Sequence, residues 1–393
     1  MFISYKTEIK PTDEQANKIL QGTGICRWLY NEYIAYNIRR YKLYQRGYLD
    51  KHQKYFVSGM DFDKYVNNVL KKKEEFKWIS LCGSKARKKA IMNAEIAFKR
   101  FFKKKSGFPR FKKKNGQDVK MYFPKNGKGD WTIERHCVQV PTVGKIKLKE
   151  FGYLPVDVIV KSGTVSQKAG RFYVSITVDV PERKYIQSGK TPLGIDLGIK
   201  EFAILSNGAK YKNINKTVTI KRLKKKLRRE QRRLSRKLEN KKKRDEKSTT
   251  FFANISKNVL KVQKLYHMLT SIRTDYVNQV INDIVKREPS HITIEDLNVK
   301  GMMKNHHLEK AVAECKFYEF RTKLIAKCHE RGIELRIADR FYPSSKICHA
   351  CGHVKHDLKL SERTYVCSEC GNVIDRDYQA ALNLRDAQEY EIV

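Results

Sequence analysis

Two C-x-x-C pairs, separated by fifteen residues, constrain the carboxyl-terminal part of this chain more than any other feature. Each pair places two sulfurs on a tight turn, and two such turns complete the tetrahedron of thiolates that a closed structural Zn²⁺ site requires. A filled shell leaves no open position, so this zinc is not expected to be catalytic. Redox-active dithiols are the alternative, although one pair would suffice for them. The predicted zinc ligands are Cys348, Cys351, Cys367 and Cys370, and the nearby His349, His353 and His356 are expected at the surface.

Three acidic residues stand where a chain rarely places a charge. Asp196 and Glu295 each lie in an apolar run with the character of a central strand. Burying an unpaired carboxylate is costly, so each is expected to face a counter-ion. Asp377 stands where a strand or loop gives way to a helix, but Asp375 could equally cap that helix through its carboxylate. For any one acid, a helix cap or a salt bridge is the alternative interpretation.

Together the acids predict a metal-dependent nuclease. Carboxylates from strand ends and a helix start can converge on hard cations such as Mg²⁺. Two such ions, about 3.5–4 Å apart, would activate a water and stabilise the leaving oxygen of a phosphodiester. The predicted catalytic Mg²⁺ ligands are Asp196, Glu295 and Asp377, with Mn²⁺ able to substitute. No nucleophile elbow and no G-x-x-x-x-G-K-[ST] loop occurs, which disfavours serine hydrolase and ATPase chemistry.

The charge balance predicts a polyanionic partner. The chain has 83 Lys and Arg against 42 Asp and Glu, a net charge of +41. Nucleic acid fits best, because each phosphate that a cation neutralises releases condensed counterions. A merely basic structural or ribosomal protein is the alternative. Residues 221–247 contribute 16 Lys or Arg and 4 acids, so most of the excess lies elsewhere and the basicity is global.

A basic helix is predicted over 218–247, with Ile220, Leu223, Leu227, Leu234 and Leu238 on one face. We favour a helix lying along a phosphate backbone over a solvated coiled-coil arm. The predicted nucleic-acid contacts are Arg110, Lys112, Arg228, Arg229, Arg232 and Arg233. Aromatic residues among the basic ones could stack on bases, namely Phe101, Phe102, Phe108 and Phe111. Large apolar residues are more often buried, so the helical pair Phe101 and Phe102 is expected in the core.

The 393 residues fit two or three domains. Residues 1–185 are predicted to form a binding module, a small antiparallel sheet or barrel with helices inserted at about 12–105. Its elements are a strand at 2–9, a helix opened by a Thr12–Gln15 capping box and running toward Tyr44, a helix at 85–104 and short strands within 118–180.

A polar linker at 181–191 leads to the second half. Its predicted elements are two strands within 192–208, helices at 218–247 and 255–287, a strand at 291–297, a helix at 308–331, a strand at 333–337 and a helix from about 377. The predicted domains are a nuclease domain at 186–347, a zinc insert at 348–371 and a last motif with a carboxyl-terminal helix at 372–393.

Membrane attachment is not expected, because no apolar stretch approaches the roughly 20 residues that span a bilayer. The amino terminus also lacks the regions of a secretory signal. Five further cysteines, Cys26, Cys82, Cys137, Cys315 and Cys328, show no disulfide-framework spacing. We therefore expect a cytoplasmic protein, associated with the nucleoid when it is bound to DNA.

In combination these motifs resemble TnpB proteins, the transposon-encoded relatives of type V CRISPR effectors. The resemblance covers nearly the whole chain and rests on 107–112 (GFPRFK), 194–198 (GIDLG), 294–297 (IEDL), 342–348 (YPSSKIC), the paired C-x-x-C and 375–384 (DRDYQAALNL). It implies an α+β multidomain fold, with an amino-terminal wedge β-barrel carrying a helical recognition insert, then an RNase H-like RuvC α/β domain with a zinc-ribbon insert. Asp196, Glu295 and Asp377 match the three catalytic acids of the family.

The resemblance also implies RNA-guided cleavage of DNA, with a transposon-derived guide RNA and target DNA as partners, by a monomer or by a dimer on one RNA. One departure from the family is Gln379, because the family motif D-x-N-A-A has asparagine at this position. Glutamine keeps the amide, but its additional methylene shifts the hydrogen-bonding groups of that amide. The open alternatives are a compact CRISPR-type effector, a catalytically inactive guide-directed DNA-binding repressor, a strand-transferring transposase and a structural zinc-ribbon protein of a ribonucleoprotein.

Overall fold

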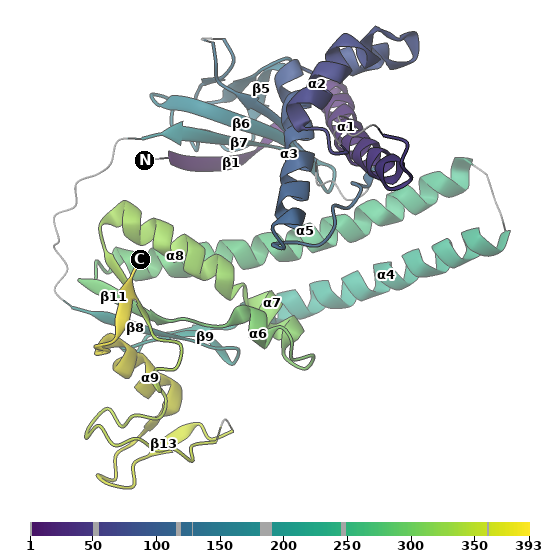
Figure 1. The fold of residues 1–393 in the computed structure, drawn as a ribbon. Helices are drawn as coiled ribbons and strands as arrows, with labels where there is room; N and C mark the ends of the chain where they lie inside the picture. The colour runs from purple at the N-terminus through teal and green to yellow at the C-terminus, as the bar shows by residue number, and fades with distance from the viewer. Residues whose placement is uncertain are drawn as a thin grey trace. The chain divides into compact units, whose positions relative to one another are not determined.

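The computed structural model describes residues 2–49, 55–114, 119–127, 129–180, 191–244, 249–359 and 361–393. The chain divides into two compact units, residues 1–181 and 182–393. Each unit has its own hydrophobic core and combines a sheet with helices (Figure 1). The predicted α+β class is therefore confirmed, whereas the finer domain boundaries stay predictions.

In the first unit, β1 (Phe2–Lys10) is the central strand of a seven-stranded antiparallel sheet. The strand order is β2-β6-β7-β1-β5-β4-β3. Among the described strands, the edge strands β2 and β3 do not pair with each other, so this sheet is open and closure of the predicted barrel is not seen. The other strands are β2 (Met121–Pro124), β3 (Thr132–Ile133), β4 (Cys137–Val140), β5 (Gly144–Leu148), β6 (Ile159–Lys168) and β7 (Arg171–Asp179).

Helix α1 (Asp13–Gln45) begins with the predicted capping box. The Gln15 backbone N–H donates to Thr12 Oγ1 at 3.3 Å, and the Thr12 N–H donates to Gln15 Oε1 at 3.0 Å. Helix α3 (Ser84–Phe102) confirms the helix predicted over 85–104. Three further elements were not predicted: α2 (Gly59–Asn68), η1 (Leu70–Lys72) and η2 (Glu74–Leu81).

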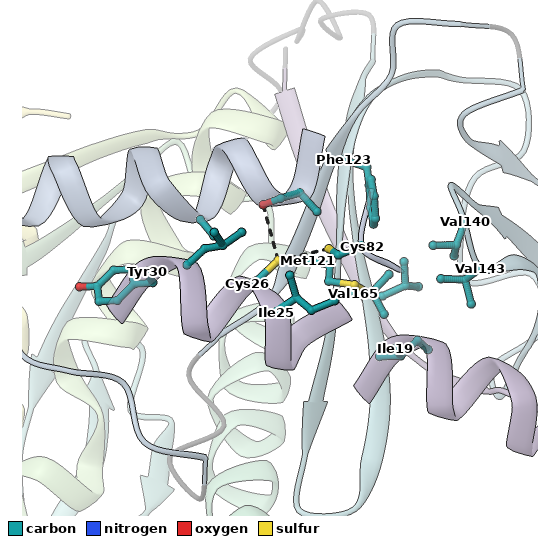
Figure 2. Close-up of a cluster of buried hydrophobic side chains, with 14 of the residues drawn as sticks. Ile19, Ile25, Cys26, Tyr30, Cys82, Met121, Phe123, Val140, Val143 and Val165 are labelled. Carbon is teal, nitrogen blue, oxygen red and sulfur yellow. Dashed lines mark hydrogen bonds between the residues drawn. The ribbon is translucent and has the colours of Figure 1, made fainter. Parts of the chain in front are cut away.

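The core of the first unit lies between these helices and the sheet. Side chains buried there include Ile25, Cys26, Cys82, Met121 and Val165 (Figure 2). Cys26 Sγ lies 3.7 Å from Cys82 Sγ, and both thiols are free, which agrees with the absence of a disulfide framework.

The second unit is built on a six-stranded mixed sheet of order β10-β9-β8-β11-β12-β15. The three strands β8, β11 and β12 are parallel neighbours, and β9 and β10 continue from β8 as antiparallel strands. The strands are β8 (Leu193–Leu197), β9 (Glu201–Leu205), β10 (Lys210–Lys212), β11 (His291–Glu295), β12 (Glu334–Ala338) and β15 (Tyr390–Ile392). Parallel pairing brings the carboxyl ends of β8 and β11 to the same edge.

Two long helices, α4 (Val218–Arg244) and α5 (Thr249–Lys286), form a hairpin that extends from this sheet (Figure 1). Their shared apolar seam is Ile220, Leu227, Val262, Leu265 and Leu269. Within the seam Asn258 Nδ2 donates to Glu230 Oε2 at 3.1 Å. The predicted basic helix is thus confirmed as far as Arg244, and its predicted end lies outside the described residues.

The helix predicted over 308–331 is wrong as one element. It divides into α7 (Glu309–Cys315) and α8 (Phe317–Arg331), because Lys316 adopts a left-handed conformation with φ of +59°. The Lys316 ammonium is held there by Thr274 Oγ1 and Glu319. The remaining elements are η4 (Ile214–Lys216), α6 (Val299–Met302), β13 (Thr364–Val366), β14 (Val373–Asp375) and α9 (Arg376–Arg385). Among the described helices, none combines the length and apolar character needed to cross a bilayer.

Candidate active site

The three predicted acids converge at one edge of the mixed sheet. Asp196 lies on β8 and Glu295 ends β11, the neighbouring parallel strand. Asp377 lies in the first turn of α9, which packs against both strands. Burial raises the pKa of Asp196 well above its ordinary value, and the charges of Glu295 and Asp377 raise it further. The carboxylates are therefore close enough to disfavour each other's ionisation.

Gly194 explains how α9 comes so near to Asp196. A Cβ atom at this position would lie 2.0 Å from the Ala381 carbonyl oxygen and 2.4 Å from the Arg385 backbone nitrogen. These neighbours are backbone atoms, which cannot rotate away. The glycine two residues before Asp196 thus lets the helix that carries Asp377 close against β8.

Glu295 is half-buried and has a polar neighbour that the sequence did not identify. Ser344 Oγ donates to Glu295 Oε1 at 2.8 Å. Burial raises the pKa of Glu295, whereas this hydrogen bond lowers it and the charge of Asp377 raises it. Ser344 lies in the motif 342–348, which ends at Cys348 of the first cysteine pair. This motif was the sequence signal that could have pointed to Ser344.

The structure separates the roles of Asp375 and Asp377. Asp375 Oδ1 accepts the backbone N–H groups of Asp377 and Tyr378, both at 3.0 Å, so Asp375 is the N-cap of α9. The Asp375 side chain is 45% exposed and that of Asp377 is 20% exposed. Asp377 faces the other acids and is bound by Arg363 at 3.2 Å and Arg376 at 3.1 Å. Neither arginine was predicted from the sequence.

The four cysteines form a second cluster beside α9. Their sulfurs all lie within 4.8 Å of one another, and among the described residues no other group of three or more His, Cys, Asp or Glu is gathered this closely. Burial opposes ionisation of Cys348, but the backbone N–H groups of Cys351 and Ala350 hold its pKa down to about 6. Gly352 and Gly371 follow the two pairs with φ of +77° and +68°. Four converging sulfurs, one of them readily ionised, fit structural zinc.

His349 does not lie free at the surface, as the sequence predicted. It is half-buried, with Nδ1 3.2 Å from Asn383 Oδ1, and its backbone N–H donates to Gln379 Oε1 at 3.5 Å. The expectation failed because α9 covers one side of the first cysteine turn. Gln379, the departure from the family motif, is fully buried, and among the described residues its Nε2 has no hydrogen-bond partner.

The predicted nucleic-acid contacts lie mostly at the surface. On α4, the side chains of Arg228, Arg229 and Arg232 are exposed, and Arg233 pairs with Glu230 at 2.9 Å. In the first unit, Arg110 is exposed, whereas Lys112 is half-buried, with its backbone held by two hydrogen bonds to Asn31. Phe108 and Phe111 are exposed. Phe102 is 56% exposed, so its predicted place in the core was wrong.

Family models match three segments of the chain. They are described as a helix-turn-helix domain of OrfB from IS605 (residues 1–46), the OrfB IS605 "Probable transposase" (175–306) and the TNB domain of Cas12f1-like proteins (317–384). The last two segments contain all three acids and all four cysteines. The chain carries the domains of the TnpB/IS605 family. In this chain, the described part of the first segment folds as β1 and one continuous helix, α1.

Curated relatives confirm the predicted resemblance. A protein of Streptomyces pristinaespiralis named "Putative RNA-guided DNA endonuclease" is 29% identical over 97% of this chain and 88% of its own length. The Escherichia coli K12 protein "Putative RNA-guided DNA endonuclease InsQ" is 28% identical over 97% of this chain and 91% of its own length. Among solved structures, Cas12f1 in a complex with sgRNA and target DNA has a similar fold, with a TM-score of 0.54, 15% identity and coverage of 96% of this chain and 83% of that one.

Proposed function

We propose that this protein is a transposon-associated, RNA-guided DNA endonuclease that hydrolyses phosphodiester bonds at Asp196, Glu295 and Asp377. The observation that carries the proposal is the convergence of these carboxylates from β8, β11 and α9, where burial and then the charges of Glu295 and Asp377 raise the pKa of Asp196. The names of the relatives, and the sgRNA and target DNA in the similar Cas12f1 complex, supply the substrate classes.

The sheet topology supports a RuvC-type nuclease domain. A parallel core of β8, β11 and β12, extended on one side by the antiparallel strands β9 and β10, is the order expected of an RNase H-like fold. On this proposal residues 186–347 and 372–393 form the RuvC domain, and 348–371 form its zinc-ribbon insert. The seven-stranded sheet with α1 to α3, within residues 1–185, is the wedge with its recognition helices.

The donor set fits divalent metal, because three carboxylates at one strand edge are hard oxygen ligands. When bound, two Mg²⁺ ions would supply activation of a water and stabilisation of the leaving oxygen. The chain's own residues hold the geometry: the Asp375 cap fixes the first turn of α9, and Ser344 orients Glu295. The cysteine cluster keeps a structural role, since a four-sulfur shell leaves no place for substrate.

The net charge of +41 supports binding of polyanionic partners, such as nucleic acid, over much of the protein. The exposed arginines of α4 are the proposed contacts to the backbone of a guide RNA and its target strand. An RNA–DNA heteroduplex can be held by shape and charge while base pairing reads the sequence. We place this activity in the cytoplasm, at the nucleoid, for a monomer or a dimer on one RNA.

The test uses purified protein with its co-purified RNA, which is sequenced first to identify a transposon-derived or CRISPR-type guide. A DNA matching that guide should be cut in Mg²⁺, and Asp196→Ala should abolish cutting but not binding. Stable binding without any product would support the repressor, and joined DNA ends would support the transposase. Cutting retained by Asp196→Ala would contradict the proposal.

A further inference from the structure

One buried asparagine connects the two clusters of the second unit. Asn383 lies on α9, six residues after Asp377, and is 4% exposed. Its Nδ2 donates to the carbonyl oxygens of Ser344 and Ile347, both at 2.7 Å. Its Oδ1 lies 3.2 Å from His349 Nδ1. Both amide hydrogens and the carbonyl oxygen are therefore engaged with the segment that enters the cysteine cluster.

That segment reaches the acids through a single hydroxyl. Ser344 is 4% exposed, and its Oγ donates to Glu295 Oε1 at 2.8 Å. Ile347 immediately precedes Cys348. A continuous set of hydrogen bonds thus runs from α9 through Asn383 and Ser344 to Glu295. The same asparagine also binds the carbonyl of Ile347 and so fixes the start of the first cysteine turn.

Other side chains could not make the same link. Aspartate has no donor for the two carbonyls, and leucine has neither donor nor acceptor. Glutamine has the same groups, but one more methylene moves them at a position that is itself only 4% exposed. The geometry is specific to an asparagine at this position of the helix.

We propose that Ser344 and Asn383 are positioning residues, which hold Glu295 in register with Asp377 and make the geometry of the acid site depend on the zinc-bearing segment. This inference rests on the proposed function. Groups that hydrogen-bond a metal ligand fix its orientation, and their loss typically costs about 10–100-fold in metal affinity or activity. Among the described residues, Glu295 is the acid of the site to which Ser344 donates, so the proposed effect acts through Glu295.

The experiment measures Mn²⁺ binding to the full-length, zinc-loaded protein by calorimetry, with Asp196→Ala as the baseline for the acid site. Ser344→Ala should bind Mn²⁺ about 10–100-fold more weakly than wild type while its zinc content stays unchanged. Ser344→Thr keeps the hydroxyl and should restore the Mn²⁺ affinity, which a merely structural role of the side chain would not require. Ser368→Ala is the matched control, because Ser368 lies in the same cysteine segment but contacts His353 and not the acids.

Asn383→Ala extends the test to the link itself. It should weaken Mn²⁺ binding and also speed the loss of zinc to a chelator, because it frees the segment before Cys348. Since the residue is buried, thermal unfolding is measured in parallel, and Ser344→Ala remains decisive if this variant does not fold.

The outcomes separate the inference from the function on which it rests. If wild type binds Mn²⁺ better than Asp196→Ala, but Ser344→Ala equals wild type in Mn²⁺ affinity, the inference is overturned and the nuclease proposal stands. If wild type binds no more Mn²⁺ than Asp196→Ala, both fail.

Discussion

The cysteine cluster and the acid cluster of the second unit are assembled in opposite ways. The four sulfurs come from one short segment and lie within 4.8 Å of one another. The three carboxylates come from two strands and a helix far apart in the sequence, and among the described residues they are not gathered as closely. Tight turns build the first cluster, whereas the second depends on the register of β8, β11 and α9.

The positions of the four sulfurs are thus set by local turns, while the site built from distant segments carries the electrostatic cost of bringing like charges together. Burial and then the like charges of Glu295 and Asp377 raise the pKa of Asp196, and two arginines pair with Asp377. The acid site should therefore be sensitive to packing and charge, and the cysteine cluster to loss of a ligand. Four substitutions test this contrast.

The largest effect is expected from loss of a thiolate. Cys367→Ser should abolish zinc binding, because structural zinc sites contribute about 10–16 kcal/mol of apparent binding free energy, which is coupled to folding. Metal analysis should find no zinc, and limited proteolysis should open the segment around β13 and β14 while the first unit stays intact. One zinc ion per chain in this variant would contradict the local model of the cluster.

The second test moves the helix of the acid site. Gly194→Ala places a methyl group against the backbone of α9, and such overpacking typically costs about 1–3 kcal/mol, occasionally more. We expect the upper part of that range in chemical denaturation, together with a strong loss of cleavage and full retention of zinc. Gly107→Ala is the control, since its Cβ meets nothing within 4 Å. Equal stability of the two variants would contradict the close packing of α9 against Gly194.

The third test removes a charge that destabilises the metal-free site. A carboxyl group whose pKa is raised on folding binds protons more tightly in the folded protein, so stability falls as pH rises between its unfolded and folded pKa values. Asp196→Asn should therefore stabilise the zinc-loaded protein without Mg²⁺ by about 1–2 kcal/mol at neutral pH, and by less in acid. Thermal unfolding against pH measures this. A gain of the same size for Asp375→Asn, at the exposed cap, would argue against repulsion among the acids.

The smallest effect concerns Gln379, whose amide nitrogen is buried without a partner among the described residues. Gln379→Met keeps a similar volume and removes the unpaired donor, but it also removes the long hydrogen bond that Gln379 Oε1 accepts from the His349 N–H at 3.5 Å, so the two effects should nearly cancel, within about 1 kcal/mol. Denaturation should find little change in the free energy of unfolding. A loss of more than about 2 kcal/mol would mean that the amide has an essential partner.

The same contrast explains what the sequence could predict. The zinc ligands, the Thr12 capping box and the strands of Asp196 and Glu295 follow from local spacing and apolar runs. Asp375 and Asp377 could not be separated, because both stand at a helix start and only the backbone N–H groups around Asp375 assign it the cap.

Other features depend on contacts between distant residues. Ser344 donates to Glu295, 49 residues away, and Asn383 donates to Ser344, 39 residues away. The motifs 342–348 and 375–384 contain these residues, but local spacing does not reveal their partners. The break at Lys316 is set by its bonds to Thr274 and Glu319, and no glycine or proline precedes it. The short strand β15 forms because β12 offers its free edge.

The central claim is that three converging carboxylates form a metal-dependent nuclease site in which Asp375 has only a structural role. Its most direct test compares cleavage of guide-matched DNA in Mg²⁺ by four isosteric variants: Asp196→Asn, Glu295→Gln, Asp377→Asn and Asp375→Asn. The account predicts no detectable cleavage by the first three, with guide and target binding retained, and near wild-type cleavage by Asp375→Asn. Cleavage that survives in Asp377→Asn and is lost in Asp375→Asn would contradict it.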